Sequence, residues 1–217
     1  MKRVLLSLLA IVASVTAIAE THTDKLLREL RNPRSNYVFV IAHRADWRNF
    51  PENSLEAIES AIKMGVDIVE LDVHRTADGE IVVCHDRTIN RTTNGKGKIS
   101  ELTLDYIRSR NLRAGHNAVT RYKMPTLAEA LDLCKGRVLI NLDKAVNYYD
   151  QIMKMLVERN MADQVIMKSS KSPAAMKEFF SHHKQNMLYM PIINYNAARW
   201  EKHKELFNDS LKTDLPF

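Results

Sequence analysis

The stretch Asp67–Val73, which reads DIVELDV, decides the fold of this chain. It is a short and mostly apolar run, typical of strands that helices cover on both faces of a parallel sheet. Because side chains alternate along a strand, Glu70 and Asp72 lie on one face and Leu71 on the other. We therefore expect the sheet to present two carboxylates together, which repel each other unless a cation or a proton lies between them.

Strand and helix patterns alternate along the rest of the chain. Five further apolar runs predict strands at Tyr37–Ala42, Glu80–Cys84, Arg137–Leu142, Gln164–Lys168 and Met187–Ile193. Helical patterns predict helices at Thr23–Arg31, Leu55–Met64, Leu104–Arg110, Thr126–Cys134, Tyr148–Arg159, Ala174–His183 and Ala197–Phe207. This order indicates parallel β/α units and an α/β fold.

The amino-terminal residues differ in composition from the remainder. The positively charged Met1–Arg3 precedes an apolar stretch, Val4–Ala13, and Ala17–Ala19 has the small-x-small pattern of a cleavage site. These features predict a signal peptide over residues 1–19, which is short for a membrane span. We expect a secreted or periplasmic domain over residues 20–217 with no stable membrane span after cleavage; a retained amino-terminal anchor is the alternative.

Composition and charge exclude some classes of partner. The chain has 217 residues, a net charge of +6 and 45% hydrophobic residues, which is typical of a globular protein. Its lysines and arginines are scattered and do not alternate with aromatic residues, so we expect no nucleic acid partner. We expect Cys84 and Cys134, the only cysteines, to be small buried thiols; a disulfide between them is the alternative in an exported protein.

Polar side chains stand at or near the ends of several predicted strands. They are His43, Glu70, Asp72, His85 and Asp143. In a β/α barrel such positions converge at one end of the sheet. Carboxylate oxygens favour a hard cation such as Ca²⁺ or Mg²⁺, and histidines beside them suit proton transfer. Taken singly, each residue also has a purely structural interpretation. The histidines can be structural residues at strand ends, Glu70 and Asp72 can form a solvated edge, and Asp143 can cap the following helix.

An ordered set of motifs resembles the glycerophosphodiester phosphodiesterase family. The motifs are His43-Arg44, Pro51–Ser54, Gly65–Asp67, Glu70–Val73, Thr76–Gly79, Val82-Val83, His85-Asp86, Arg91–Gly95, and Met124–Leu127 with Glu129. The resemblance is close over residues 38–145 and implies a TIM-type (β/α) barrel. About six of its eight β/α units are evident, and residues from about 87 to 118 would form a small insertion after the third strand, over the mouth of the barrel.

The resemblance also implies an activity, namely metal-dependent hydrolysis of a small glycerophosphodiester to glycerol 3-phosphate and an alcohol. The implied roles are metal binding by Glu70, Asp72 and Asp143, acid and base catalysis by His43 and His85, and phosphate binding by Arg44. A guanidinium offers a fork of donors that suits phosphate oxygens. The head group, the choice between Ca²⁺ and Mg²⁺, the division of roles between the histidines, the nucleophile and the oligomeric state remain open.

The chain departs from the family pattern at three positions. Ala45 stands where glycine is usual, and Asp143 stands where glutamate is usual. The usual lysine is replaced by Ala145, and strand alternation places the neighbouring Lys144 on the opposite face, away from the phosphate. We expect Lys168, at the end of the fifth predicted strand, to supply the missing positive charge.

Two other functions stay open at this point. One is a phospholipase-type phosphodiesterase of the same barrel superfamily. The other is a truncated, inactive barrel that binds a ligand or a metal. A closed barrel needs eight strands and six are predicted, so we expect the chain to be incomplete at its carboxyl end.

Overall fold

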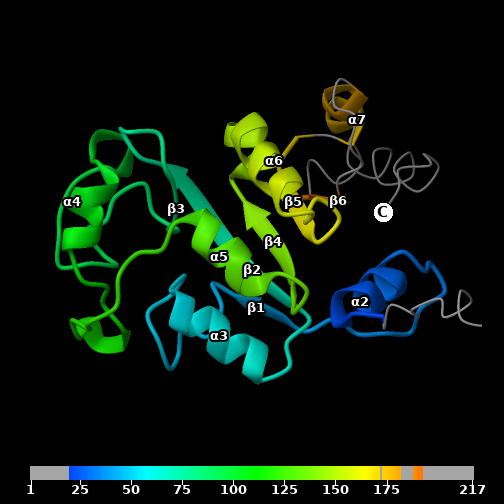
Figure 1. Cartoon of the computed structure of the whole chain (residues 1–217), viewed down its shortest axis with the longest axis horizontal. Helices are drawn as coiled ribbons and strands as arrows, with labels where there is room; N and C mark the ends of the chain where they lie inside the picture. Colours follow the sequence, from blue (N-terminus) through cyan, green and yellow to red (C-terminus); the bar gives the residue numbers. More distant parts are fainter. Residues whose placement is uncertain (1–19, 172, 182–187, 193–217) are drawn as a thin grey trace, which may run out of the picture.

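A computed structural model describes residues 20–171, 173–181 and 188–192 of the chain. Its strands form a curled parallel sheet, half of a barrel, in the order β1-β2-β4-β5-β6 (Figure 1). These strands are β1 (Ile41–His43), β2 (Ile68–Arg75), β4 (Leu139–Asp143), β5 (Val165–Ser169) and β6 (Leu188–Pro191). The prediction of an α/β barrel-type fold is confirmed.

The third predicted strand differs from the expectation. β3 (Ile81–Val83) pairs antiparallel with β2, with Val83 opposite Val73. Only a tight turn separates the two strands, whereas a parallel crossover needs a dozen or more residues. Gly79 in this turn has a φ of +90°, which glycine adopts without a steric penalty. Counting this strand as a parallel β/α unit is therefore wrong, and it forms a hairpin with β2.

Helices cover the outer face of the sheet. They are α3 (Leu55–Lys63), α5 (Leu127–Cys134), α6 (Tyr149–Glu158) and α7 (Pro173–Ser181). Alternate residues of β2, such as Leu71, pack with the buried faces of α3, α5 and α6 in one hydrophobic core. The remaining residues of β2, among them Glu70 and Asp72, therefore face the inside of the curled sheet. Ser54 caps α3, because its hydroxyl accepts a hydrogen bond from the backbone N–H of Ala57.

One helix closes the end of the sheet where the strands begin. This helix, α2 (His22–Leu30), starts with a capping box at Thr21. Its apolar contacts join Leu26 and Leu27 to Ile68, Leu139, Ile166 and Leu188. These four sheet residues lie at or next to the first residue of their strands. The amino ends of the strands are thus covered, and their carboxyl ends are left for the polar side chains.

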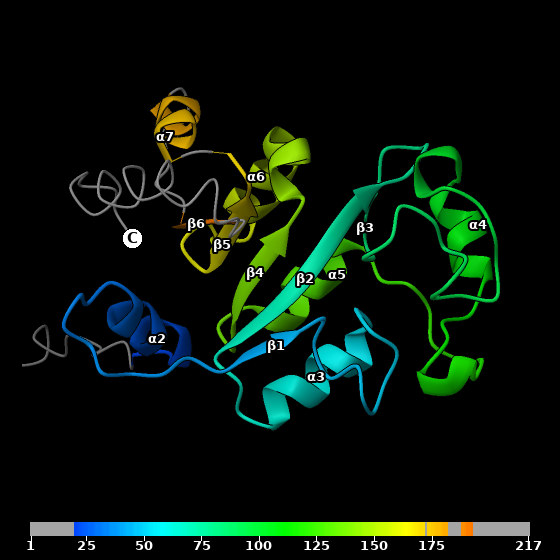
Figure 2. The ribbon, with the colours of Figure 1, turned by 180° about the vertical axis from the view of Figure 1, so that it is seen from behind.

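The segment predicted as an insertion has a small core of its own. It contains η1 (Ile99–Glu101), α4 (Leu104–Ser109) and η2 (Gly115–Asn117). The buried residues of this core are Val82, Cys84, Ile89, Ile99, Ile107, Leu112 and Met124. Figure 2 shows the segment beyond the carboxyl end of β2, on the side of the hairpin. It stands beside the end of the sheet at which the predicted site residues converge.

The cysteines are free and buried, as predicted. Burial raises the pKa of the Cys84 thiol to about 11 and that of Cys134 to about 12, so neither is a reactive thiolate at neutral pH. In the part of the chain that the structure describes, no helix is long and apolar enough to cross a bilayer. The predicted signal peptide over residues 1–19 and the predicted helix Ala197–Phe207 lie outside the described residues.

Candidate active site

Three carboxylates meet at the carboxyl end of the sheet. In the parallel register of β2 and β4, Asp72 stands beside Asp143 and Glu70 stands beside Asn141. One oxygen from each of Glu70, Asp72 and Asp143 lies within 4.8 Å of the others. Glu70 and Asp72 are 4% and 1% exposed, so two of these charges are held away from bulk water. The structure therefore brings together the three residues predicted as metal ligands.

Two ammonium groups lie among these carboxylates. The Nζ atom of Lys168 is 2.7 Å from Glu70 Oε1 and 3.4 Å from Asp143 Oδ2. The Nζ atom of Lys144 is 2.6 Å from Asp72 Oδ1. Burial by itself would raise the pKa of Asp72, but hydrogen bonds from Lys144 and Asn53 hold that pKa below its usual value. Burial likewise opposes the charge of Lys168, yet the bond to Glu70 raises the pKa of this lysine.

The expectation that Lys144 points away from the site is wrong. The regular strand ends at Asp143, so the alternation of faces ends there too. Lys144 has a φ of +66°, a left-handed conformation that turns the backbone after the strand. The Asp143 carboxylate accepts a hydrogen bond from the backbone N–H of Lys144 at 2.8 Å, which supports this conformation. Lys144 therefore reaches the acidic cluster at Asp72, while Lys168 pairs with Glu70 and Asp143.

The oxygen atoms around the three carboxylates are of the kind that coordinates a divalent cation. Two buried amide oxygens, Asn53 Oδ1 and Asn141 Oδ1, have no hydrogen-bond partner within the described part of the chain. Asn53 is next to the carboxylates, since its Nδ2 donates to Asp72 Oδ2 at 3.3 Å. A buried acceptor without a hydrogen-bond partner lowers the stability of the fold by about 1–3 kcal/mol. Carboxylate and amide oxygens are the ligands that hard cations prefer, so such a cation would offset this cost.

His43 and Arg44 lie at the rim of the acidic cluster. His43 pairs with Glu70 across β1 and β2, and its Nε2 atom is 3.9 Å from Glu70 Oε2. Its side chain is 64% exposed and is open to a ligand. The Arg44 guanidinium donates to Glu52 at 3.3 Å, while its buried Nε has no described hydrogen-bond partner. Ala45 has a φ of +60°, which explains in steric terms why glycine suits this position.

His85 lies beyond the end of β3 and is held by its neighbour. Its Nδ1 atom is 2.7 Å from Asp86 Oδ1. Hydrogen bonds from Arg91 and His85 keep the pKa of Asp86 far below its usual range, so the carboxylate stays charged. The backbone carbonyl of His85 lies 3.3 Å from the Nε2 atom of His74, whose pKa burial lowers. This arrangement fixes the His85 ring and leaves its Nε2 free.

A chain of ion pairs joins the two sides of the site. The Arg91 guanidinium binds Asp86 at 2.8 and 3.0 Å and Glu52 at 2.7 and 2.8 Å. Glu52 in turn accepts a hydrogen bond from Arg44. His85 and Arg44 are thus connected through three charged residues to which the sequence analysis assigned no role. Their only signal in the sequence was membership of the motifs that carry the resemblance.

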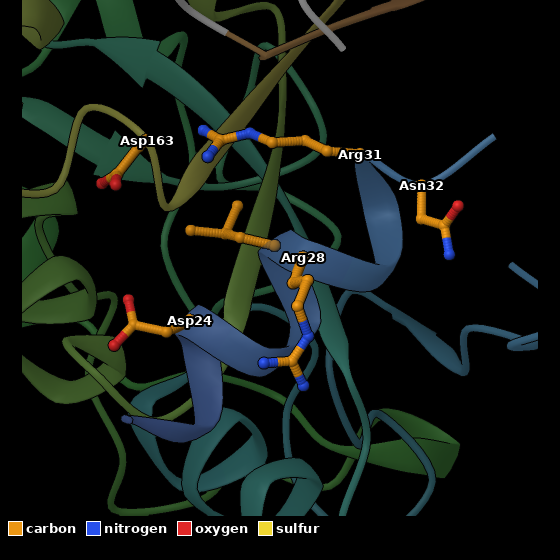
Figure 3. Close-up of a pocket in the computed structure, with 6 residues that line it drawn as sticks. Asp24, Arg28, Arg31, Asn32 and Asp163 are labelled. Atoms are coloured by element: carbon orange, nitrogen blue, oxygen red, sulfur yellow. The ribbon is translucent and has the colours of Figure 1, made fainter. Parts of the chain in front are cut away.

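A separate hollow of about 460 Å³ lies beside α2 (Figure 3). Its lining includes Asp24, Arg28, Arg31, Asn32 and Asp163, and Figure 3 shows these mixed charges around it. The hollow contains none of the predicted site residues. Because α2 packs on the amino ends of the strands, we place the functional site at the opposite end.

Comparisons with known proteins point to one family. Residues 43–197 match the Glycerophosphoryl diester phosphodiesterase family. A glycerophosphodiester phosphodiesterase of Caldanaerobacter subterraneus subsp. tengcongensis is 36% identical over 162 residues, which is 69% of this chain and 66% of the relative. Glycerophosphodiester phosphodiesterase 1 of Bos taurus is 44% identical over 109 residues, which is 49% of this chain and 33% of the relative.

Solved structures support the fold. A glycerophosphoryl diester phosphodiesterase from Parabacteroides distasonis has a TM-score of 0.71 at 23% identity, with 85% of this chain and 64% of that chain covered. A glycerophosphodiester phosphodiesterase from Agrobacterium tumefaciens has a TM-score of 0.58 at 25% identity, with 69% and 64% covered. The chain therefore spans just under two thirds of the length of these proteins.

Proposed function

The chain belongs to the glycerophosphoryl diester phosphodiesterase family, and we propose that it hydrolyses a glycerophosphodiester to glycerol 3-phosphate and an alcohol. The observation that carries this proposal is the acidic cluster of Glu70, Asp72 and Asp143, whose oxygens lie within 4.8 Å of one another. The cluster stands between a histidine and an arginine on one side and a second histidine on the other. A cation held by these carboxylates, together with the arginine, would neutralise a phosphate, and the histidines would move protons around it.

Glu70, Asp72 and Asp143 would hold one divalent cation, and we propose Ca²⁺ or Mg²⁺ for their preference for oxygen ligands. When bound, the cation supplies positive charge to the non-bridging phosphate oxygens. We assign Arg44 to the same phosphate oxygens, because its guanidinium lies at the rim of the cluster, with Nε 3.9 Å from Asp72 Oδ2. Lys168 adds an ammonium group at the inner side of the cluster, and we assign it to phosphate binding.

We assign the proton transfers to His43 and His85. One ring takes the proton from the nucleophile, and the other gives a proton to the leaving alkoxide. The Asp86 carboxylate beside Nδ1 of His85 keeps that nitrogen protonated, so Nε2 is the nitrogen that accepts and returns a proton. His43 is exposed at the rim, where a leaving alcohol or a water molecule can reach it.

The direct experiment measures glycerol 3-phosphate release by the purified mature chain. The substrates are glycerophosphocholine, glycerophosphoethanolamine and glycerophosphoinositol, with intact phosphatidylcholine as the control for the phospholipase alternative. We expect release from a soluble diester, with loss in EDTA and recovery on adding Ca²⁺ or Mg²⁺. Cleavage of intact phosphatidylcholine alone, measured as released choline or phosphocholine, or release of glycerol 3-phosphate from none of the soluble diesters, would overturn the proposal. A cation-induced rise in melting temperature tests the metal site independently of turnover.

We also propose that the protein is exported, on the basis of the residues before Glu20. The test is the mass of the protein recovered from the periplasm or the medium of expressing bacteria. A mature chain that begins at Glu20 supports export. A cytoplasmic chain that retains Met1–Ala19 would contradict it.

A further inference from the structure

A large cationic cavity opens beside the acidic cluster. It has a volume of about 850 Å³ and lies between η3 (Ala145–Tyr148) and the first part of the inserted segment. The basic side chains that line it are His74, Arg75, Arg87, Lys98 and Lys144. Within the described part of the chain, no carboxylate lines this cavity. Its volume is within the range of small-molecule sites, and its lining has one sign of charge.

The cavity lies next to the proposed catalytic site, with Lys144 between them. Lys144 lines it and also lies 2.6 Å from Asp72. His74 follows Asp72 by two residues on β2, so it shares the inner face of the sheet. A molecule whose phosphate lies at the acidic cluster therefore has room to extend past these two residues into the cavity.

Two of the cations have no acidic partner among the described residues. The guanidinium of Arg75 lies 5.6 Å from the centre of the Tyr148 ring, a cation–π contact that leaves its charge uncompensated. Arg87 is exposed and has no described ion pair. Lys98 is paired with Glu101 at 2.8 Å, and this pair is exposed to solvent. Arg75 and Arg87 are thus the strongest free donors for an anion.

We propose that this cavity binds a second phosphate group carried by the alcohol part of the diester. The proposal rests on the proposed function, since it concerns which diester the same site prefers. Uncompensated cations attract an anionic leaving group and disfavour a cationic one such as choline or ethanolamine. The preferred substrates are then glycerophosphodiesters whose alcohol is itself phosphorylated.

A matched pair of substrates tests this preference. Glycerophosphoinositol and glycerophosphoinositol 4-phosphate differ only in a phosphate on the alcohol. We expect kcat/KM to be roughly tenfold higher for the phosphorylated substrate, and Arg87→Ala to reduce this ratio by roughly twofold to fivefold, the range for one exposed charge pair. Arg121→Ala is the control, because Arg121 is an exposed arginine like Arg87 but lies outside the cavity. Equal kcat/KM values, or a ratio that Arg87→Ala leaves unchanged, would overturn the proposal.

A binding measurement separates this proposal from the proposed function. Calorimetry at low salt with inositol 4-phosphate and inositol requires no turnover. Tighter binding of the phosphate, weakened at least about twofold by Arg87→Ala but not by Arg121→Ala, supports the cavity as an anion site. If neither diester is hydrolysed, the proposed function fails. The comparison of inositol 4-phosphate with inositol then tests by itself whether the cavity binds a phosphate group. Equal binding of the two alcohols overturns the inference whether or not the diesters are hydrolysed.

Discussion

Lys144 Nζ lies 2.6 Å from Asp72 Oδ1, although Asp72 belongs to β2 and Lys144 follows the last residue of β4. The Lys144 ammonium group thus forms an ion pair with a carboxylate that we assign to metal binding. Asp72 is 1% exposed, and an unpaired charge at such a position is costly. Lys144 therefore compensates the charge of Asp72, and we expect it to compete with a cation for this carboxylate.

Replacing this lysine tests the competition. We expect Lys144→Ala to lower the free energy of unfolding in EDTA by about 1–3 kcal/mol, the cost of leaving a buried group unpaired. Added Ca²⁺ or Mg²⁺ is expected to raise the melting temperature more in this variant than in the wild type. Lys98→Ala, which removes an exposed ion pair, is the control and is expected to change little. The same cation-induced shift in Lys144→Ala and wild type would contradict the competition.

Arg91 is expected to act as a positioning residue for His85 and Arg44. Arg91→Lys keeps the charge but removes the fork that binds Asp86 and Glu52 together. We expect kcat/KM to fall about tenfold, with a change in the pH profile of kcat/KM as His85 loses its fixed partner. Arg137→Lys is the matched control, because Arg137 binds Glu59 with two nitrogens on an exposed surface. An unchanged pH profile of kcat/KM in Arg91→Lys would show that Arg91 does not position His85.

The two histidines are expected to be needed for turnover. His43→Ala and His85→Ala should each lower kcat by about a hundredfold or more, since a positioned acid or base contributes that much. The melting temperature of His43→Ala is expected to stay near that of the wild type, because this side chain is 64% exposed. The assay is glycerol 3-phosphate release at saturating cation. Near-normal turnover in either variant would show that its histidine has another role.

Acid is expected to destabilise the site. The pKa values of Asp72, Asp86 and Glu52 are lowered in the folded chain by their cationic partners, against the opposing effect of burial. Their contribution to stability is therefore complete above the unfolded pKa values, near pH 4–5, and is lost as the pH falls through the lower folded values. Melting temperatures between pH 7 and pH 3 should fall less steeply for Asp86→Asn than for the wild type. Equal slopes of melting temperature against pH in Asp86→Asn and wild type would contradict a contribution of the Asp86 charge to stability.

The grouping of the three carboxylates could be predicted from the sequence because strand alternation is local. It places Glu70 and Asp72 on one face, and the parallel register with β4 adds Asp143 beside them. Alternation could not place Lys144, since it assumes pairing that stops at Asp143. The direction of β3 was not predicted, because a short apolar run fits a parallel strand and a hairpin equally well.

The long-range ion pairs could not be predicted from the sequence, for a different reason. Arg91 and Glu52 are separated by 39 positions along the chain, and neither spacing nor polarity relates them. Their contact depends on how the inserted segment folds against the loop after β1. The cationic cavity has the same origin, because its lining comes from β2, the inserted segment and η3.

The most direct measurement of the central claim is the cation dependence of glycerol 3-phosphate release by the wild type and by Asp143→Ala. Wild-type release is expected to disappear in EDTA and to return with Ca²⁺ or Mg²⁺. Asp143→Ala should need at least about tenfold more cation for half-maximal rate, since it loses one of three charged ligands. Release that is undiminished in EDTA, or an identical cation requirement in both proteins, would contradict the claim that Glu70, Asp72 and Asp143 form the metal site of the reaction.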